Sequence, residues 1–311
     1  MNVIFMGTPE FAVPTLQSLY DAGHNITLVV TQPDKPSGRG KKLKKSEVKE
    51  RAELLNLPIF QPDKIKKNEN IEFLKQYDAD VIVVVAYGQI LSKEILEYPK
   101  FGCINVHASL LPSLRGAAPL NWAIINGNNK SGVTTMMMDI GLDTGDMLLK
   151  SEIDIDKHMC VGELHDKLMV MGAELLIETL NKVENNELIR IKQDETLSSY
   201  APMLDKNTQK INWNESAKNI HNLIRGLSPW PTAFFTMEDK NIKVYKSSVI
   251  NENDNFEFEP GFIIKADESG IRVACKKGIL VIEEIQMPGK NKMNLSAYLR
   301  GNKFPEKIIL N

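Results

Sequence analysis

Cysteine is scarce in this chain, and its three copies lie far apart. Cys103, Cys160 and Cys275 form no CxxC pair, so the sequence predicts neither a zinc ribbon nor a disulfide framework. A chain that does without disulfides suits a reducing compartment, and we therefore expect a cytoplasmic location.

Long apolar runs and excess charge are also missing. No apolar stretch reaches the roughly 18 residues needed to cross a bilayer, so we expect no membrane association. The first residues, MNVIFMGTPEF, have no basic start and soon turn polar, which predicts no secretory signal. The net charge of −2 over 311 residues gives no sign that the protein as a whole attracts nucleic acid or a membrane surface. A Gly-x-Ser-x-Gly motif is absent, which argues against an α/β-hydrolase.

The first third of the sequence has an alternating α/β pattern. An apolar run at 2–7 is followed by a helical pattern over 8–22 and a second apolar run at 26–32. This strand–helix–strand order predicts a parallel sheet. Residues 79–88 form the most continuous apolar run of the chain, as expected for a central strand. The first turn holds a single glycine, Gly7, so a GxGxxG dinucleotide site is not indicated.

Residues 101–119, FGCINVHASLLPSLRGAAP, place polar side chains at the end of a predicted strand. Asn105 and His107 are two residues apart and would project from the same face. Pro112 then stops the strand, so both side chains would lie beside a loop. The pattern also fits a polar strand end whose hydrogen bonds are satisfied within the fold.

Residues 139–146, DIGLDTGD, put three acids and two glycines at the exit of another predicted strand, 132–140. Such a cluster can bind a metal ion, orient an imidazole or simply form a turn. The spacing is not that of a calcium loop, so the metal is the least favoured of the three. An amide, an imidazole and a carboxylate at neighbouring strand ends suit acyl transfer.

Residues 34–51 carry eight Lys or Arg and three acids in a stretch rich in proline and glycine. Such a run is either a solvated surface loop or a clamp for a phosphate backbone. Its predicted place, at the carboxyl end of the second strand, is the edge where open α/β sheets bind ligands.

The second part of the chain differs in charge and pattern. Residues 206–311 hold 16 Lys/Arg and 12 Asp/Glu, whereas the first 205 residues hold 22 and 28, so the two parts carry opposite net charges. A helix at about 214–226 precedes five short strand patterns, which predict a small barrel of the OB type. We expect Trp230, Phe234 and Tyr245 in its core. The predicted domains are 1–186 and 206–311, joined by a linker at 187–205.

Several motifs resemble one enzyme family. NVHASLLP, the following RGAAP and the later GLDTGDM resemble the signature of the folate-dependent formyltransferases. FMGTPEFAVP, TQPDKPSGRGKK, VVVAYGQIL, YAPML and SPWPTAF are similar to the branch of this family that acts on methionyl initiator tRNA. The resemblance covers nearly the whole chain. It implies a Rossmann-like α/β domain with a parallel sheet, followed by an OB-like β-barrel, and formyl transfer to the amino group of the aminoacyl-tRNA.

The same resemblance assigns roles to individual residues. It implies a catalytic trio of Asn105, His107 and Asp143, 10-formyltetrahydrofolate as formyl donor and initiator methionyl-tRNA as partner. We also expect no metal ion and a monomeric enzyme. The residues implied to contact the folate are Ser109, Leu110, Leu111 and Pro112, with Gln89, Ile90 and Leu91 at the border of the pterin pocket. The residues implied to grip the tRNA acceptor stem are Arg39, Lys41 and Lys42.

One short segment departs from the family pattern. Ser113 and Leu114 stand where the family usually has a basic and then an aromatic residue, while Arg115 is retained. Three alternatives stay open on sequence grounds. They are a formyltetrahydrofolate hydrolase, a formyltransferase with a sugar-nucleotide or glycinamide ribonucleotide acceptor, and a non-catalytic RNA-binding module.

Overall fold

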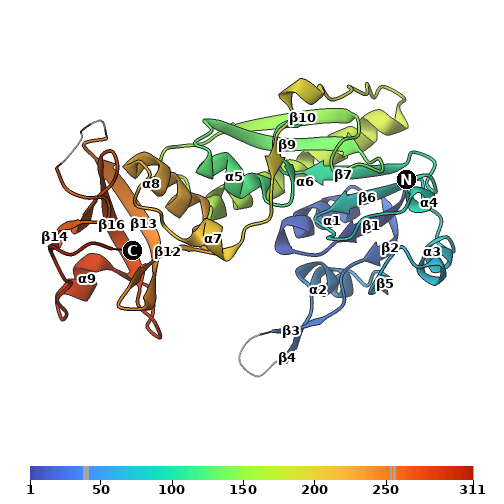
Figure 1. Cartoon of the computed structure of the whole chain (residues 1–311). Coiled ribbons are helices and arrows are strands. Elements are labelled where there is room, and N and C mark those ends of the chain that lie inside the picture. Colours follow the sequence, from blue (N-terminus) through green and yellow to red (C-terminus); the bar gives the residue numbers. More distant parts are fainter. Residues whose placement is uncertain (38–41, 253, 255–256, 311) are drawn as a thin grey trace. The chain divides into compact units, whose positions relative to one another are not determined.

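The computed structural model describes residues 1–37, 42–252, 254 and 257–310 (Figure 1). Contacts divide the chain into two compact units. The first unit comprises Met1–Gly116, Ser131–Ile153 and His165–Ala201, and the second comprises Ala117–Lys130, Asp154–Leu164 and Pro202–Asn311. The domain limits 1–186 and 206–311 stay a prediction, and the second unit also takes in two segments from the first 186 residues.

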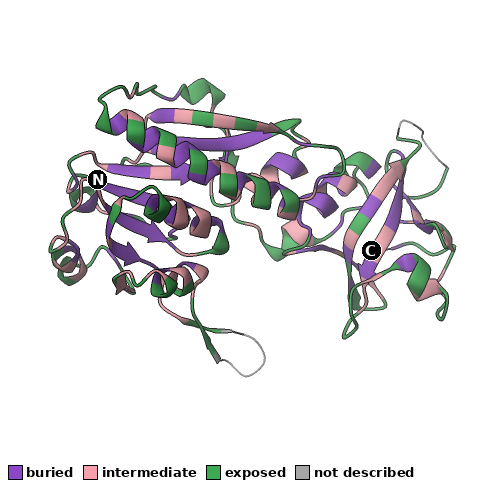
Figure 2. Cartoon of the chain, turned by 180° about the vertical axis from the view of Figure 1, so that it is seen from behind, coloured by how far each residue is buried: buried purple, intermediate pink, exposed green. Residues whose placement is uncertain are grey.

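A seven-stranded sheet organises the first unit. Its order is β10 (Met147–Asp154), β9 (Lys130–Met137), β7 (Cys103–His107), β6 (Val81–Val85), β1 (Asn2–Gly7), β2 (Asn25–Val30) and β5 (Ile59–Phe60). The pairs β7–β6, β6–β1, β1–β2 and β2–β5 are parallel, which confirms the predicted parallel α/β core. β9 runs antiparallel to β7, so the sheet is mixed beyond that strand. The central strands are buried on both faces, whereas β10 alternates between buried and exposed residues (Figure 2).

Helices cover both faces of this sheet because alternate strand residues point to opposite sides. On one face, Ile4 and Ile82 pack with Ile71 of α3 (Asn68–Leu74) and Ile95 of α4 (Lys93–Leu96). On the other face lies α6 (Val161–Glu184), whose Gly172 approaches Val106 so closely that an added Cβ would lie 2.9 Å from its Cγ1.

Two further helices lie near the N-terminus. The helical pattern of 8–22 forms a short 3₁₀ turn, η1 (Glu10–Ala12), and then α1 (Val13–Asp21). α2 (Glu47–Leu54) begins after Ser46, whose hydroxyl accepts a hydrogen bond from the Lys49 amide at 3.1 Å. This cap fixes where the basic segment becomes helical.

The second unit is an antiparallel β domain packed on helices. Its strands pair in the order β12 (Ala233–Met237), β13 (Lys240–Ile250), β16 (Ile279–Gln286), β15 (Gly270–Ala274) and β14 (Ile263–Asp267), with β17 (Met293–Asn294) beside β16. The helices are α5 (Pro119–Ile125), α7 (Lys206–Gln209), α8 (Ala217–Gly226) and α9 (Leu295–Leu299). The antiparallel β domain was predicted, and closure of its strands into an OB-like barrel stays a prediction.

Two segments that come early in the chain attach to α8. The Asn121 side chain of α5 donates to the Gly226 carbonyl at 2.8 Å. The Arg225 guanidinium donates to the carbonyls of Asp156 and Met159, at 3.2 and 3.1 Å. These bonds to backbone carbonyls explain why 117–130 and 154–164 belong to the second unit.

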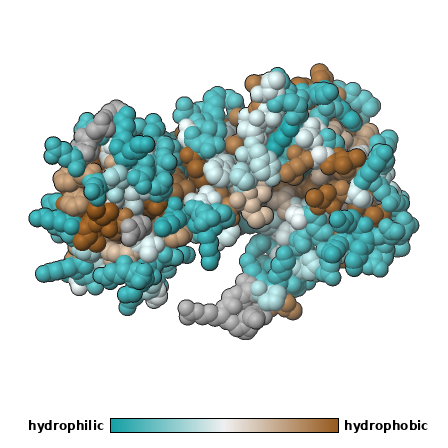
Figure 3. Space-filling model, viewed as in Figure 1, coloured by the Kyte–Doolittle hydropathy of each residue, from teal (hydrophilic) through white to brown (hydrophobic). Residues whose placement is uncertain are grey.

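The aromatic residues expected in the core of the β domain divide into two groups. Phe234 and Tyr245 are half-buried, but Trp230 is 78% exposed. The prediction for Trp230 was wrong because this residue lies between two prolines in a loop that precedes β12, where strand alternation does not apply. Hydrophilic side chains cover most of the visible surface, with apolar residues gathered in patches (Figure 3). Within the described ranges, no helix is both long and apolar enough to cross a membrane.

Candidate functional site

The carboxyl end of β7 carries the two polar residues predicted from the sequence. His107 is buried, and its Nε2 lies 3.1 Å from the Leu114 carbonyl oxygen. A carbonyl can only accept, so Nε2 carries a hydrogen and donates it. The other ring nitrogen, Nδ1, lies 3.6 Å from Asp143 Oδ2. Both ring nitrogens therefore face oxygen atoms, the Leu114 carbonyl at hydrogen-bond distance and the Asp143 carboxylate at ion-pair distance.

Asn105 lies two residues before His107 on the same strand. Its side chain is half-buried and is not engaged by the other residues that the structure describes. On either side, Asn105 pairs with Val84 of β6 and Met136 of β9. A carboxamide that the fold leaves uncommitted at a strand end can donate to a bound oxygen atom.

The acidic turn at 139–146 uses its carboxylates for different purposes. Asp139 Oδ1 accepts from the Gly141 amide at 3.0 Å and from the Thr144 hydroxyl at 2.7 Å, so this residue closes the turn. Asp143 instead faces His107, and its Oδ2 also accepts from the Gly116 amide at 2.9 Å. The sequence left three roles open for this cluster: a metal site, a partner for an imidazole, or a turn. In the structure the residues form a turn, and one of its carboxylates lies next to the imidazole. Among the described residues, no group of three or more His, Cys, Asp or Glu is placed to hold a metal ion.

Backbone geometry in this turn explains its residue types. Asp143 has a φ of 55°, in the left-handed region that Asp tolerates better than most residues. Gly145 packs so tightly on β9 that an added Cβ would lie 1.8 Å from the Met137 carbonyl oxygen. Glycine at 145 is therefore required for the turn to lie against the end of β9.

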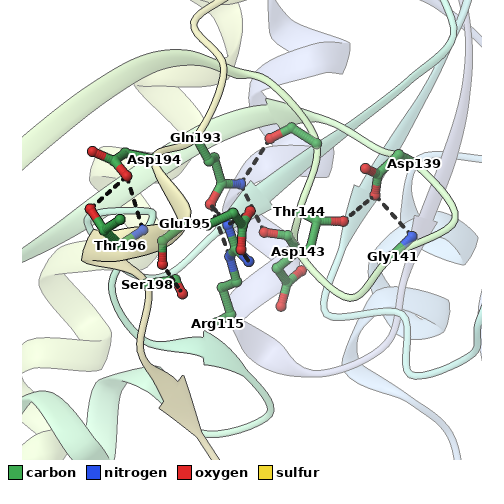
Figure 4. A network of polar contacts seen from close by, with 11 residues as sticks. Arg115, Asp139, Gly141, Asp143, Thr144, Gln193, Asp194, Glu195, Thr196 and Ser198 are labelled. Carbon is green, nitrogen blue, oxygen red and sulfur yellow. Dashed lines mark hydrogen bonds and ion pairs between the residues drawn. The ribbon is translucent and has the colours of Figure 1, made fainter.

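A network of polar side chains holds the backbone of this turn (Figure 4). The Gln193 amide nitrogen donates to the carbonyls of Asp143 and Gly145, both at 2.8 Å. Its oxygen accepts from Nε and Nη2 of Arg115, at 3.0 and 2.8 Å. Arg115 also forms a bidentate pair with Glu195, at 2.8 and 2.9 Å. These supporting residues were not predicted as part of the site.

The segment Ser109–Pro112 is fixed by neighbouring strands. Thr134 of β9 links it twice, because its hydroxyl donates to the Ser109 carbonyl at 2.7 Å and accepts from the Leu111 amide at 3.2 Å. Lys150 of β10 donates to the Leu111 carbonyl. Burial lowers the pKa of this lysine. Leu111 is fully buried, while Leu110 and Pro112 are half-buried. Leu110 and Pro112 are thus the more accessible members of this predicted folate-contacting group.

Ser113 and Leu114, which depart from the family pattern, take part through their backbones. The Ser113 carbonyl accepts from the Ser109 hydroxyl at 2.7 Å. The Leu114 amide donates to the Ser199 hydroxyl at 2.9 Å, and the Leu114 carbonyl accepts from His107. These contacts use no side-chain atom of Ser113 or Leu114.

The predicted border of the pterin pocket follows β6. The Gln89 side chain is held by the chain before α3, since its oxygen accepts from the Ile65 amide at 2.8 Å and its nitrogen donates to the Pro62 carbonyl at 3.2 Å. Leu91 is buried in the apolar cluster below the sheet. Ile90, in contrast, is 78% exposed and is therefore the accessible residue of these three.

The basic segment is only partly described. Arg39 and Lys41 lie outside the described residues, and Lys42 belongs to β4 (Lys42–Lys44), which pairs antiparallel with β3 (Lys35–Ser37). Three other bases of the run are paired with carboxylates. Lys44 lies 2.6 Å from Glu47, Lys45 lies 2.7 Å from Glu53, and Lys49 lies 2.7 Å from Asp34. Hydrogen bonds from Gln61 and from Lys49 lower the pKa of Asp34. The charge available from this run for a partner is thus smaller than its count of eight suggests.

Comparison with known proteins identifies the family. Residues 1–180 match the model described as "Formyl transferase", and residues 203–303 match "Formyl transferase, C-terminal domain". The chain belongs to the formyl transferase family. As a member of it, this protein is a formyl-transferring enzyme, and Asn105, His107 and Asp143 lie within the part of the chain that matches the first model.

Full-length relatives support this assignment. The chain is 55% identical over 311 residues to a protein of Clostridium novyi named "Methionyl-tRNA formyltransferase", with complete coverage of both chains. A protein of Clostridioides difficile with the same name is 52% identical over 310 residues, again with complete coverage.

Solved structures share the fold of this formyltransferase. An N-formyltransferase from Helicobacter canadensis, solved with folinic acid and dTDP-3-aminofucose, has a TM-score of 0.67 at 20% identity and covers 91% of this chain and 99% of its own. A sugar 3N-formyl transferase solved with dTDP and 5-N-formyl-THF has a TM-score of 0.69 at 22% identity, with coverages of 94% and 99%.

Proposed function

We propose that this enzyme transfers the formyl group of 10-formyltetrahydrofolate to the free amino group of methionyl initiator tRNA. The observation that carries this proposal is the end-to-end identity of 55% with a relative named "Methionyl-tRNA formyltransferase". Other acceptors, such as sugar nucleotides, are less favoured because the two structures described above, solved with dTDP and with dTDP-3-aminofucose, are only 22% and 20% identical to this chain.

We propose Asn105, His107 and Asp143 as the catalytic residues. The Asn105 amide donates to the formyl oxygen as it becomes an oxyanion. His107 lies on the same strand face, and its Nε2–H becomes a second donor when it exchanges the Leu114 carbonyl for that oxygen. Asp143 stabilises the charged imidazole, because its carboxylate faces Nδ1. As the amine nitrogen bonds to the formyl carbon, the bond from that carbon to folate N10 breaks and the amine's proton passes to N10.

The residues present fit a folate donor. A folate with a formyl group on N10 supplies an activated one-carbon unit. The uncommitted Asn105 amide lies in β7, and the exposed Ile90 side chain follows the neighbouring strand, β6. Tyr87, also after β6, has a buried hydroxyl without a hydrogen-bond partner among the described residues. Burial raises the pKa of this tyrosine, so the hydroxyl stays protonated and able to donate.

We propose that the tRNA is held by the basic segment and by the second part of the chain. Arg39, Lys41 and Lys42 are the residues proposed to contact the acceptor stem. Residues 206–311 carry a net charge of +4, which suits a polyanion. A hydrolase that used water as acceptor would need neither feature.

The fate of a labelled formyl group tests the proposal. The purified enzyme is mixed with 10-formyltetrahydrofolate labelled in the formyl group and with methionyl initiator tRNA. We expect the label on the aminoacyl group. Label released only as formate would support a hydrolase, and label retained on the folate would exclude both activities. Uncharged initiator tRNA is the matched control, because it keeps every phosphate but lacks the amine.

A further inference from the structure

Gln193 lies in the segment that joins the end of α6 to β11 (Tyr200–Ala201), far in sequence from the proposed catalytic residues. Its side chain is 5% exposed. Figure 4 shows it between Arg115 on one side and the turn of Asp143 and Thr144 on the other. A buried amide in a polar, solvent-side segment needs partners for all of its hydrogen-bonding groups.

Every hydrogen-bonding group of this amide is used. Both hydrogens go to the turn, to the carbonyls of Asp143 and Gly145 at 2.8 Å each. The oxygen accepts two hydrogens from Arg115, which fixes which end of the amide faces the turn. A flipped amide would place its oxygen against two carbonyl oxygens and its nitrogen against a guanidinium.

The two carbonyls that Gln193 holds belong to Asp143 itself and to Gly145, in the backbone that directly follows the Asp143 side chain. Asp143 has a left-handed backbone, with a φ of 55°. The direction of its carboxylate therefore depends on the peptide planes that follow it. The carboxylate is fixed at its other end by the Gly116 amide, at 2.9 Å, next to Arg115 in sequence. Gln193 thus holds the backbone that follows Asp143, while the Gly116 amide holds the Asp143 carboxylate.

We infer that Gln193 is a positioning residue for catalysis, which holds the Asp143 turn so that the carboxylate faces His107. This inference rests on the proposed function. Gln193 touches no reacting atom and acts through Asp143 alone. Removal of its amide lets the turn relax, and displacement of a catalytic group by about 1 Å costs up to about 10²-fold in rate.

The segment around Gln193 has other attachments, so its loss does not release the chain. Ile191 and Met147 exchange two backbone hydrogen bonds, at 2.8 and 2.9 Å. Tyr200 and Ala201 of β11 pair with β8 (Arg115–Gly116). A substitution at 193 therefore changes the turn without detaching its support.

The test compares Gln193→Leu and Gln193→Glu with the wild type. Leucine keeps the size of the side chain but loses all four hydrogen bonds, and glutamate places an oxygen where the two carbonyls need a donor. We expect kcat to fall about 10- to 100-fold in both variants while KM for the folate and for the tRNA stays near the wild-type values. Gln76→Leu is the matched control, because Gln76 is exposed and lies outside the site.

A second arm separates positioning from a general structural role. In an Asp143→Asn background, the addition of Gln193→Leu should lower kcat no further, because both changes remove the same function. Independent, multiplying losses in the double variant would overturn the inference, as would an unchanged kcat in Gln193→Leu.

A third arm does not depend on activity. The Gly116 amide donates to Asp143, so its hydrogen exchange, followed by NMR or by mass spectrometry of the peptide that contains it, should accelerate in Gln193→Leu and not in Gln76→Leu. Unchanged exchange would overturn the inference. Wild-type enzyme that fails to formylate methionyl-tRNA while Gly116 exchange responds as expected would contradict the proposed function and leave the positioning of Asp143 supported.

Discussion

The Asp143 carboxylate joins two parts of the site, because the same oxygen, Oδ2, lies 3.6 Å from His107 Nδ1 and 2.9 Å from the Gly116 amide. The imidazole is held at its other nitrogen by the Leu114 carbonyl. This arrangement leaves the Asn105 amide as the uncommitted donor beside them, and it makes the negative charge of Asp143 the feature that distinguishes the site from a plain strand end.

Asp143→Asn should lower kcat by about 10²- to 10⁴-fold, the range that general acid–base catalysis contributes. The amide keeps the size of the side chain and can still accept from Gly116, but it removes the charge that stabilises a protonated imidazole. Single-turnover formylation under saturating substrates measures the effect. Asp146→Asn, an acid of the same turn that does not contact His107, should retain most of the activity. A rate within a fewfold of wild type for Asp143→Asn would contradict this role.

Gly145→Ala should destabilise the first unit and reduce activity together. An added Cβ would lie 1.8 Å from the Met137 carbonyl, so the turn has to move away from β9. The expected cost is about 1–3 kcal/mol in free energy of unfolding. Urea denaturation measures it, and Gly301→Ala is the control because nothing lies within 4 Å of its added Cβ. Equal stability of the two variants would contradict the close contact between Gly145 and the Met137 carbonyl of β9.

Replacement of Arg39, Lys41 and Lys42 by glutamine should weaken tRNA binding and flatten its salt dependence. Each lost phosphate contact reduces the slope of log K against log salt by about 0.9. Binding titrations at several salt concentrations measure the slope. Lys45→Gln is the control, because Lys45 is paired with Glu53 and should contribute little. An unchanged slope in the triple variant would make the segment an ordinary surface loop.

Stability should fall as the pH drops below about 6.5, in part because of His221. Its ring lies between the Ser247 hydroxyl, 3.0 Å from Nδ1, and the Lys157 carbonyl, 3.2 Å from Nε2. Burial, and then the charge of Arg225, lower the pKa of this histidine. The unfolded chain therefore takes up a proton at a higher pH than the folded chain does. The stabilisation is complete above the unfolded pKa and is lost as the pH falls through the folded pKa.

The unfolding midpoints of His221→Gln and wild type are measured between pH 7.5 and 5, a window that extends on the order of one pH unit to either side of the ordinary histidine pKa. The difference between the two proteins isolates the contribution of His221. The variant should show a shallower fall in unfolding midpoint than the wild type. Identical slopes in the two proteins would exclude His221 as the cause.

Sequence patterns predicted the parts of the site that depend on strand geometry. Asn105 and His107 follow from the two-residue repeat of a strand. The place of Asp143 does not follow from a shared edge of parallel strands, because β9, which precedes it, runs antiparallel to β7. The β-α-β order of the first unit and the short strands of the second followed from apolar periodicity. These features depend on the local spacing of residue types, which a single sequence shows directly.

Features that depend on contacts with distant backbone atoms could not be predicted from the sequence. Gln193 binds carbonyls 48 and 50 residues away, and a carbonyl has no residue-type signature. The backbone roles of Ser113 and Leu114 were hidden for the same reason. Trp230 was misplaced because an apolar residue between prolines carries no periodicity that would tell core from surface.

The central claim is that this enzyme formylates methionyl initiator tRNA through Asn105 and His107. The most direct measurement is the turnover of labelled formyl transfer to that tRNA by Asn105→Ala and His107→Ala under saturating 10-formyltetrahydrofolate. We predict a loss of about 10²- to 10³-fold in each variant relative to wild type, the usual cost of removing one oxyanion donor. Turnover close to that of the wild type in both variants would contradict the account.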